Sequence, residues 1–89
     1  MKTDRNAFKI LIVDDHPLIR VGVTALLSRQ TDLEVCGEAI DVDEAIEQVV
    51  RLQPDLMILD MSLRSGTGLD VIKRLRQTSS SNGTRILVH

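Results

Sequence analysis

Aromatic residues are almost absent from this chain, which has one phenylalanine and neither tyrosine nor tryptophan among its 89 residues. Without aromatic rings, the chain offers no platform on which the bases of single-stranded nucleic acid could stack. The net charge of −2 also lacks the positive excess that binding to nucleic acid or acidic membranes requires. We therefore expect neither DNA nor a membrane to be a direct partner of this segment.

The single cysteine, Cys36, excludes an internal disulfide, and its position in an apolar run predicts a buried structural thiol. The chain has no apolar run long enough to span a bilayer, and residues 1–7 are polar rather than signal-like. A chain this short forms one domain at most, which we place at 8–89 after a polar N-terminal tail at 1–7. These absences favour a protein of the reducing cytoplasm.

Four segments are predicted to be strands, and the first of them is a continuous apolar, β-branched run of the kind that is covered by helices on both faces. They are FKILIV at 8–13, LEVCGEAI at 33–40, DLMIL at 55–59 and, after a serine loop at 79–81, RILVH at 85–89. Segments with helical periodicity separate them, so the order is βαβαβαβ. This alternation predicts an α/β fold with a doubly wound parallel sheet of the flavodoxin type and strand order 2-1-3-4.

Three helices are expected between these strands. The first begins at Pro17, where a missing N–H does no harm, and ends near Arg29. Asp41 and Glu44 resemble a capping box that opens the second helix, and Pro54 marks its end. The apolar residues predicted to face inward are Ile19, Val23, Leu26 and Leu27, then Val42, Ala45, Ile46, Val49 and Leu52, and finally Leu69, Ile72 and Leu75.

Acidic residues stand directly after two of the predicted strands: Asp14 and Asp15 follow the first strand, and Asp60 follows the third. These two strands are neighbours in the expected sheet, so all three acids should meet at its carboxyl edge, where ligands bind in such folds. Burying ionised carboxylates is costly, and like charges about 4 Å apart repel by about 4 kcal/mol at a surface-like dielectric. A divalent cation removes this repulsion, so the cluster predicts a metal site.

Mg²⁺ suits this site because it takes oxygen ligands in octahedral geometry and keeps several waters. Asp15 and Asp60 can each give one carboxylate oxygen and Ser62 its backbone carbonyl, while Asp14 can hold a bound water. With its charge neutralised, Asp60 becomes an available nucleophile for a phosphoryl group. These residues thus predict phosphoryl transfer to Asp60 with the help of Mg²⁺.

The same residues carry a family resemblance. KILIVDDHPLIRVGV, PDLMILDMSLRSGTGLDVIKRLR and RILVH resemble the receiver domain of bacterial two-component response regulators, most of all the subfamily with a C-terminal helix-turn-helix output domain. The resemblance implies that Asp60 is the phosphoacceptor, that Asp14 and Asp15 are the acidic pair, and that the Ser62 carbonyl completes the Mg²⁺ shell. It also implies a sensor histidine kinase, whose phosphohistidine is the phosphoryl donor, and regulation of transcription as the output.

The sequence departs from this family in several places. Arg64 stands where most members have a proline, four residues after the phosphoacceptor. The chain stops one residue before the expected Ser or Thr, and the fifth strand with its terminal Lys, the last helices and the output domain are absent. A receiver domain truncated after its fourth strand leaves RILV as a bare edge and apolar surface on one face. We therefore expect instability, self-association or exchange with a second chain, unless the sequence is part of a longer one.

Several residues also have a purely structural interpretation. His16 is either a metal ligand or a residue that merely precedes a helix, and His89 ends a strand without an evident chemical role. Ser62 either tunes the lifetime of a phosphoryl group or is an ordinary loop residue. Gly66 and Gly68 permit positive φ angles in a turn.

Two other function classes are compatible with the acid cluster. An aspartate-nucleophile phosphohydrolase uses the same nucleophile, but such enzymes generally place a second Asp two residues later, where this chain has Ser62. A dimerisation module could hold a cation without phosphotransfer. We favour a signalling module that takes up a phosphoryl group itself, rather than an enzyme that turns over an external substrate.

Overall fold

The computed structural model describes residues 7–78 and 83–89, so most of the expected tail at 1–7 and the serine loop at 79–81 lie outside the described residues. The elements in chain order are β1 (Phe8–Val13), α1 (Pro17–Leu27), β2 (Leu33–Ala39), α2 (Val42–Leu52), β3 (Leu56–Leu59), β4 (Ser62–Leu63), β5 (Gly66–Thr67), α3 (Gly68–Arg76) and β6 (Arg85–Val88).

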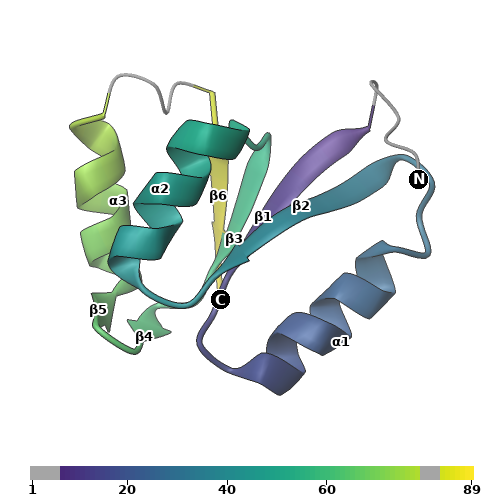
Figure 1. The fold of residues 1–89 in the computed structure, drawn as a ribbon, viewed down its shortest axis with the longest axis horizontal. Coiled ribbons are helices and arrows are strands. Elements are labelled where there is room, and N and C mark those ends of the chain that lie inside the picture. The colour runs from purple at the N-terminus through teal and green to yellow at the C-terminus, as the bar shows by residue number, and fades with distance from the viewer. Residues whose placement is uncertain (1–6, 79–82) are drawn as a thin grey trace.

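Four of the strands form a parallel sheet in the order β2-β1-β3-β6, which confirms the predicted order of the first to fourth long strands. The helices α2 and α3 lie side by side on one face of this sheet, and α1 lies on the other face beside β2 (Figure 1). The sheet is therefore doubly wound, as the alternation of strands and helices predicts. All four strands end at the same edge, and that edge is where the acidic residues lie.

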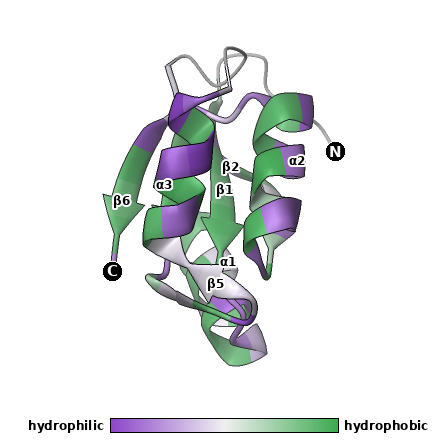
Figure 2. Cartoon of the chain, turned by 90° about the vertical axis from the view of Figure 1, so that its left-hand side faces the viewer, coloured by the Kyte–Doolittle hydropathy of each residue, from purple (hydrophilic) through white to green (hydrophobic). Residues whose placement is uncertain are grey.

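The central strand β1 is buried on both faces, as its continuous apolar run predicts. Leu11 and Val13 belong to the core beneath α2 and α3, whereas Ile10 and Ile12 alternate with them and face the other side of the sheet. Figure 2 shows the hydrophobic strands behind α2 and α3, whose turns alternate between hydrophobic and hydrophilic residues. This packing anchors the strand that carries the acidic pair.

Helix α2 begins and ends close to the predicted residues. The Asp41 side chain accepts a hydrogen bond from the Glu44 N–H at 2.8 Å, which confirms the predicted cap. The Glu44 carboxylate, however, reaches back to the N–H of Ile40 at 2.8 Å instead of to that of Asp41. The helix ends at Leu52, and Gln53 adopts a left-handed conformation with φ of 50° just before Pro54.

The segment 62–67, which includes Gly66 of the predicted turn, folds as a short antiparallel hairpin of β4 and β5. Thr67 caps the helix that follows, and its side chain forms a complete capping box with Asp70. The prediction that Leu69 faces inward is wrong, because its side chain is 48% exposed. The buried residues of α3 are Gly68, Val71 and Leu75, which confirms the prediction for Leu75, and Ile72 packs against the core as a partly buried residue.

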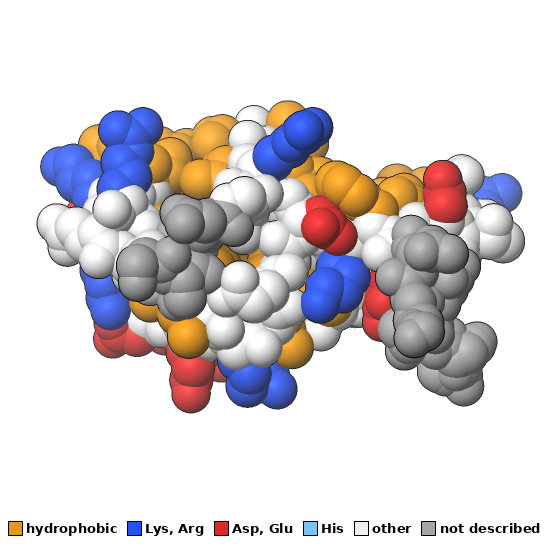
Figure 3. All heavy atoms as spheres, turned by 90° about the horizontal axis from the view of Figure 1, so that it is seen from above, with side chains coloured by type: hydrophobic (Ala, Val, Ile, Leu, Met, Phe, Trp, Pro, Cys, Tyr) orange, Lys and Arg blue, Asp and Glu red, His pale blue; other side chains and the backbone are white. Residues whose placement is uncertain are grey.

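Helix α1 differs most from expectation, because it has no buried residue. Ile19 and Leu26, both predicted to face inward, are 44% and 64% exposed, whereas Val23 and Leu27 are half-buried. The reason is that, among the residues that the structure describes, no second helix lies beside α1 on its face of the sheet (Figure 1). In the space-filling view from above, exposed apolar side chains gather along the upper edge of the molecule (Figure 3).

None of the three helices within residues 7–78 and 83–89 combines the length and the apolar character that crossing a membrane would need.

Candidate functional site

Backbone hydrogen bonds continue the sheet past the last residues of its strands and so place the acids side by side. The N–H of Asp60 donates to the carbonyl of Val13 at 2.9 Å, and the N–H of Asp14 donates to the carbonyl of Ala39 at 2.9 Å. The N–H of His89 likewise donates to the last carbonyl of β3 at 3.0 Å. The carboxyl edge of the sheet therefore presents Asp14, Asp60 and His89 from three neighbouring strands.

Asp14 is buried, with only 1% of its side chain exposed. Its Oδ1 accepts a hydrogen bond from the backbone N–H of His16 at 2.9 Å and lies 2.6 Å from Nδ1 of the His16 ring. Burial alone would raise the pKa of Asp14, but these two bonds and the charge of the ring outweigh it and hold the pKa below its ordinary value. Asp14 is thus kept ionised at neutral pH.

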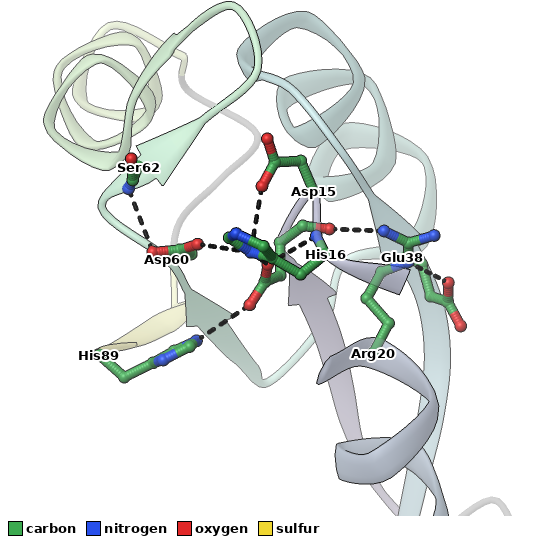
Figure 4. Close-up of polar contacts among 8 residues, drawn as sticks. Asp15, His16, Arg20, Glu38, Asp60, Ser62 and His89 are labelled. Atoms are coloured by element: carbon green, nitrogen blue, oxygen red, sulfur yellow. Dashed lines mark hydrogen bonds and ion pairs between the residues drawn. The ribbon is translucent and has the colours of Figure 1, made fainter. Parts of the chain in front are cut away.

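The His16 ring lies among all three carboxylates (Figure 4). Its Nδ1 is 3.2 Å from Oδ1 of Asp15 and 3.4 Å from Oδ2 of Asp60, in addition to the contact with Asp14. The hydrogen bond to Asp14 and the charge of Asp15 raise the pKa of His16, although 60% of its side chain is exposed. The surrounding carboxylates therefore favour the protonated form of the ring.

Asp60 is held by the loop that follows it. The N–H of Ser62 donates to Oδ1 of Asp60 at 3.1 Å, which fixes the orientation of a carboxylate that is 13% exposed (Figure 4). The start of α3 packs closely on the same loop, because the N–H of Gly68 donates to the carbonyl of Met61 at 2.9 Å. A Cβ atom at Gly68 would lie 2.9 Å from the carbonyl oxygen of Asp60, so this position needs glycine for close approach rather than for a positive φ.

Two further residues complete the surroundings of Asp14. Arg20 of α1 donates to the Asp14 carbonyl at 2.8 Å and pairs with Glu38 of β2 at 2.8 Å, which ties α1 to the end of β1. From the other side, Nε2 of His89 approaches Oδ2 of Asp14 to 3.5 Å. Arg20 therefore binds the backbone of Asp14, whereas the His89 ring lies beside its carboxylate.

The side chains of this cluster fit a hard divalent cation. One ligand atom from each of Asp14, Asp15, His16 and Asp60 lies within 4.8 Å of the others. Oδ2 of Asp14 and Oδ1 of Asp15 are buried and have no hydrogen-bond donor among the described residues. Carboxylate oxygens that are buried without a donor are costly unless a cation satisfies them, and Mg²⁺ prefers such oxygen ligands.

The structure thus brings together the three carboxylates that the sequence predicts to converge. Ser62 adjoins them through its N–H, while its backbone carbonyl stays a predicted ligand. The sequence did not indicate the parts played by Arg20 and His89, or the insertion of the His16 ring into the cluster. The only signal for His16 is its position directly after the acidic pair.

Comparison with known proteins agrees with this geometry. The response regulator receiver domain family matches residues 10–89. The nitrate/nitrite response regulator protein NarL of Escherichia coli K12 is 42% identical over 79 residues, which are 89% of this chain and 36% of that protein. The transcriptional regulatory protein LiaR of Bacillus subtilis is 36% identical over 67 residues, which are 75% of this chain and 32% of that protein.

Among solved structures, the signal receiver domain of the response regulator NarL from Mycobacterium tuberculosis superposes with a TM-score of 0.83. It is 34% identical, and the match covers 93% of this chain and 65% of that one. The chain spans about a third of the length of the curated relatives it matches. The fold, the carboxyl-edge acids and these matches show that the chain belongs to the response regulator receiver domain family.

Proposed function

We propose that this domain accepts a phosphoryl group on Asp60 from the phosphohistidine of a sensor histidine kinase in the cytoplasm. Asp14, Asp15, Asp60 and the backbone carbonyl of Ser62 hold Mg²⁺, and phosphorylation switches an output domain that regulates transcription and supplies the contact with DNA. One observation carries this proposal, namely the convergence of Asp14, Asp15 and Asp60 at the carboxyl edge of the sheet.

The residues divide the chemistry among them. Asp14 is too buried to meet a phosphoryl donor, and its Oδ1 is already hydrogen-bonded. Asp60 is more accessible, and the Ser62 N–H holds its Oδ1, so Oδ2, whose contact in the structure is the exposed His16 ring at 3.4 Å, is the oxygen that attacks phosphorus. In that step an O–P bond forms on Asp60, the N–P bond of the phosphohistidine breaks, and the histidine keeps the bonding electrons and takes up a proton. Mg²⁺, when bound, supplies charge neutralisation for the phosphoryl oxygens.

Self-association belongs to the same proposal. Leu87 and Val88 on the edge strand β6 are 54% and 44% exposed, and edge strands with apolar side chains favour pairing with another chain. We expect the isolated 89-residue chain to form dimers or larger species in which β6 is covered. Light scattering after size-exclusion chromatography measures this, and a sharp monomeric species with cooperative unfolding would contradict it.

The experiment that tests the phosphoacceptor uses Mg²⁺ and a small phosphodonor such as acetyl phosphate, with uptake measured by intact-mass spectrometry. We expect one phosphoryl group per wild-type chain and none on Asp60→Asn. Asp55→Asn is the matched control, because Asp55 lies at the opposite end of the same strand, where its carboxylate accepts from the Lys9 N–H at 2.7 Å. This control should be phosphorylated like the wild type.

Uptake by Asp60→Asn would show that the acceptor lies elsewhere. Sustained release of phosphate from small esters would instead favour the phosphohydrolase, and Mg²⁺ binding without any phosphoryl adduct would favour the cation-holding dimerisation module.

A further inference from the structure

The His16 ring nitrogen lies where the three carboxylates of the proposed Mg²⁺ site converge. Nδ1 is 2.6 Å from Asp14, 3.2 Å from Asp15 and 3.4 Å from Asp60, measured to one oxygen of each carboxylate. No other basic side chain in the described residues contacts all three. Figure 4 shows the ring between Asp15 and Asp60, with its nitrogen turned toward both.

A cation that bonds these carboxylates needs the space that the ring now fills. Mg²⁺ takes oxygen ligands at about 2.1 Å, so an ion that bonds oxygens of these carboxylates has to lie between them, which is where the ring nitrogen now lies. Imidazole nitrogen is also a better ligand for zinc, copper or nickel than for magnesium. Ring and ion therefore compete for the same oxygens instead of sharing them.

Little else holds the ring in place. Its side chain is 60% exposed, so it can turn outward without opening a cavity in the core. His16 is the N-cap residue of α1, yet its side chain makes no capping hydrogen bond, so the helix does not depend on the ring either. In contrast, Oδ2 of Asp14 is buried without a hydrogen bond and stays available for an ion.

We propose that the His16 side chain is an internal substitute for the cation, which holds the three carboxylates together in the metal-free domain and is displaced when Mg²⁺ binds. This inference rests on the proposed function, because it takes the same carboxylates as the Mg²⁺ site. His16 is then a positioning residue that sets the affinity of the site for Mg²⁺. It keeps the acids assembled before the ion arrives, and it lowers the apparent affinity by the free energy of its own contacts.

The test compares Mg²⁺ binding to wild type, His16→Ala and His89→Ala by isothermal titration calorimetry at one fixed pH and ionic strength. Removing the competing ring should tighten Mg²⁺ binding about threefold to tenfold, the factor that corresponds to one lost hydrogen bond. His89→Ala is the matched control, since its ring contacts one of the three carboxylates and at the longer distance of 3.5 Å. Its effect should be smaller than that of His16→Ala.

A second measurement follows the ring itself. In the wild-type protein, nuclear Overhauser contacts between the His16 ring and the β protons of Asp14 and Asp60 should be present without metal and lost at saturating Mg²⁺. Contacts that persist, or Mg²⁺ binding to His16→Ala that is unchanged or weaker, would overturn the inference and leave the proposed function intact. Absence of Mg²⁺ binding in both proteins would overturn the two together.

Discussion

The substitution Gly68→Ala tests how closely α3 packs against the loop that follows Asp60. A Cβ atom at this position would lie 2.9 Å from the Asp60 carbonyl oxygen, 2.8 Å from Sδ of Met61 and 3.0 Å from its Cα. Two of these atoms belong to the backbone, so they cannot rotate away. Helix propensity favours alanine by up to about 1 kcal/mol, whereas overpacking of this kind costs about 1–3 kcal/mol. The clash therefore wins, and we expect a net destabilisation of about 1–2 kcal/mol.

Gly22→Ala provides the matched control, because a Cβ at Gly22 in α1 would meet nothing within 4 Å. Here helix propensity acts alone, so stability should rise by up to about 1 kcal/mol. Urea denaturation followed by far-UV circular dichroism measures both variants, since the chain has no tryptophan or tyrosine for fluorescence. Because the clash moves the Asp60 carbonyl, phosphoryl uptake should fall in Gly68→Ala only. A Gly68→Ala protein as stable as the wild type would refute this reasoning.

Two further predictions concern the core and the buried carboxylate. Leu11→Ala should lower the free energy of unfolding by about 2–5 kcal/mol, because Leu11 is 0% exposed in the core. The control Leu18→Ala, at a residue that is 84% exposed, should change it by less than about 0.5 kcal/mol. Equal effects of the two substitutions in urea denaturation would contradict the assigned burial. The pKa of Asp14 is lower in the folded protein than its ordinary value of 3.8, so its contribution to stability is present above that pH and disappears as the pH falls through the folded pKa. In metal-free buffer, the wild type should therefore lose stability relative to Asp14→Asn as the pH falls below about 4. A stability difference that does not change with pH would contradict the lowered pKa of Asp14.

The sheet could be predicted because the amino-acid composition of its strands differs from that of the rest of the chain. A strand that is buried on both faces has no polar positions, and in β1 Leu11 and Val13 face one side while Ile10 and Ile12 face the other. Acidic residues that follow such a strand directly must therefore lie at its end. The pairing of the first and third strands then follows from the doubly wound order. The convergence of Asp14 and Asp60 could thus be predicted from the sheet topology alone.

Side-chain orientation depends on tertiary contacts that no local pattern contains. Periodicity placed Leu69 and Leu26 inward, yet α3 buries Val71 and Leu75, α1 has no buried residue, and both leucines are exposed. The hairpin of β4 and β5 is too short to give a strand pattern. The His16 ring is drawn into the cluster by charges that come from two separate strands, which a reading of adjacent residues cannot detect.

The most direct test of the central claim replaces Mg²⁺ by paramagnetic Mn²⁺ and records amide resonances of the protein. If Asp14, Asp15 and Asp60 share one divalent ion, a single equivalent of Mn²⁺ should broaden the signals of residues 14–16 and 60–62 together, and Asp15→Asn should abolish the effect. Broadening centred elsewhere, for example on Asp43 in α2 and Asp70 in α3, would contradict the claim.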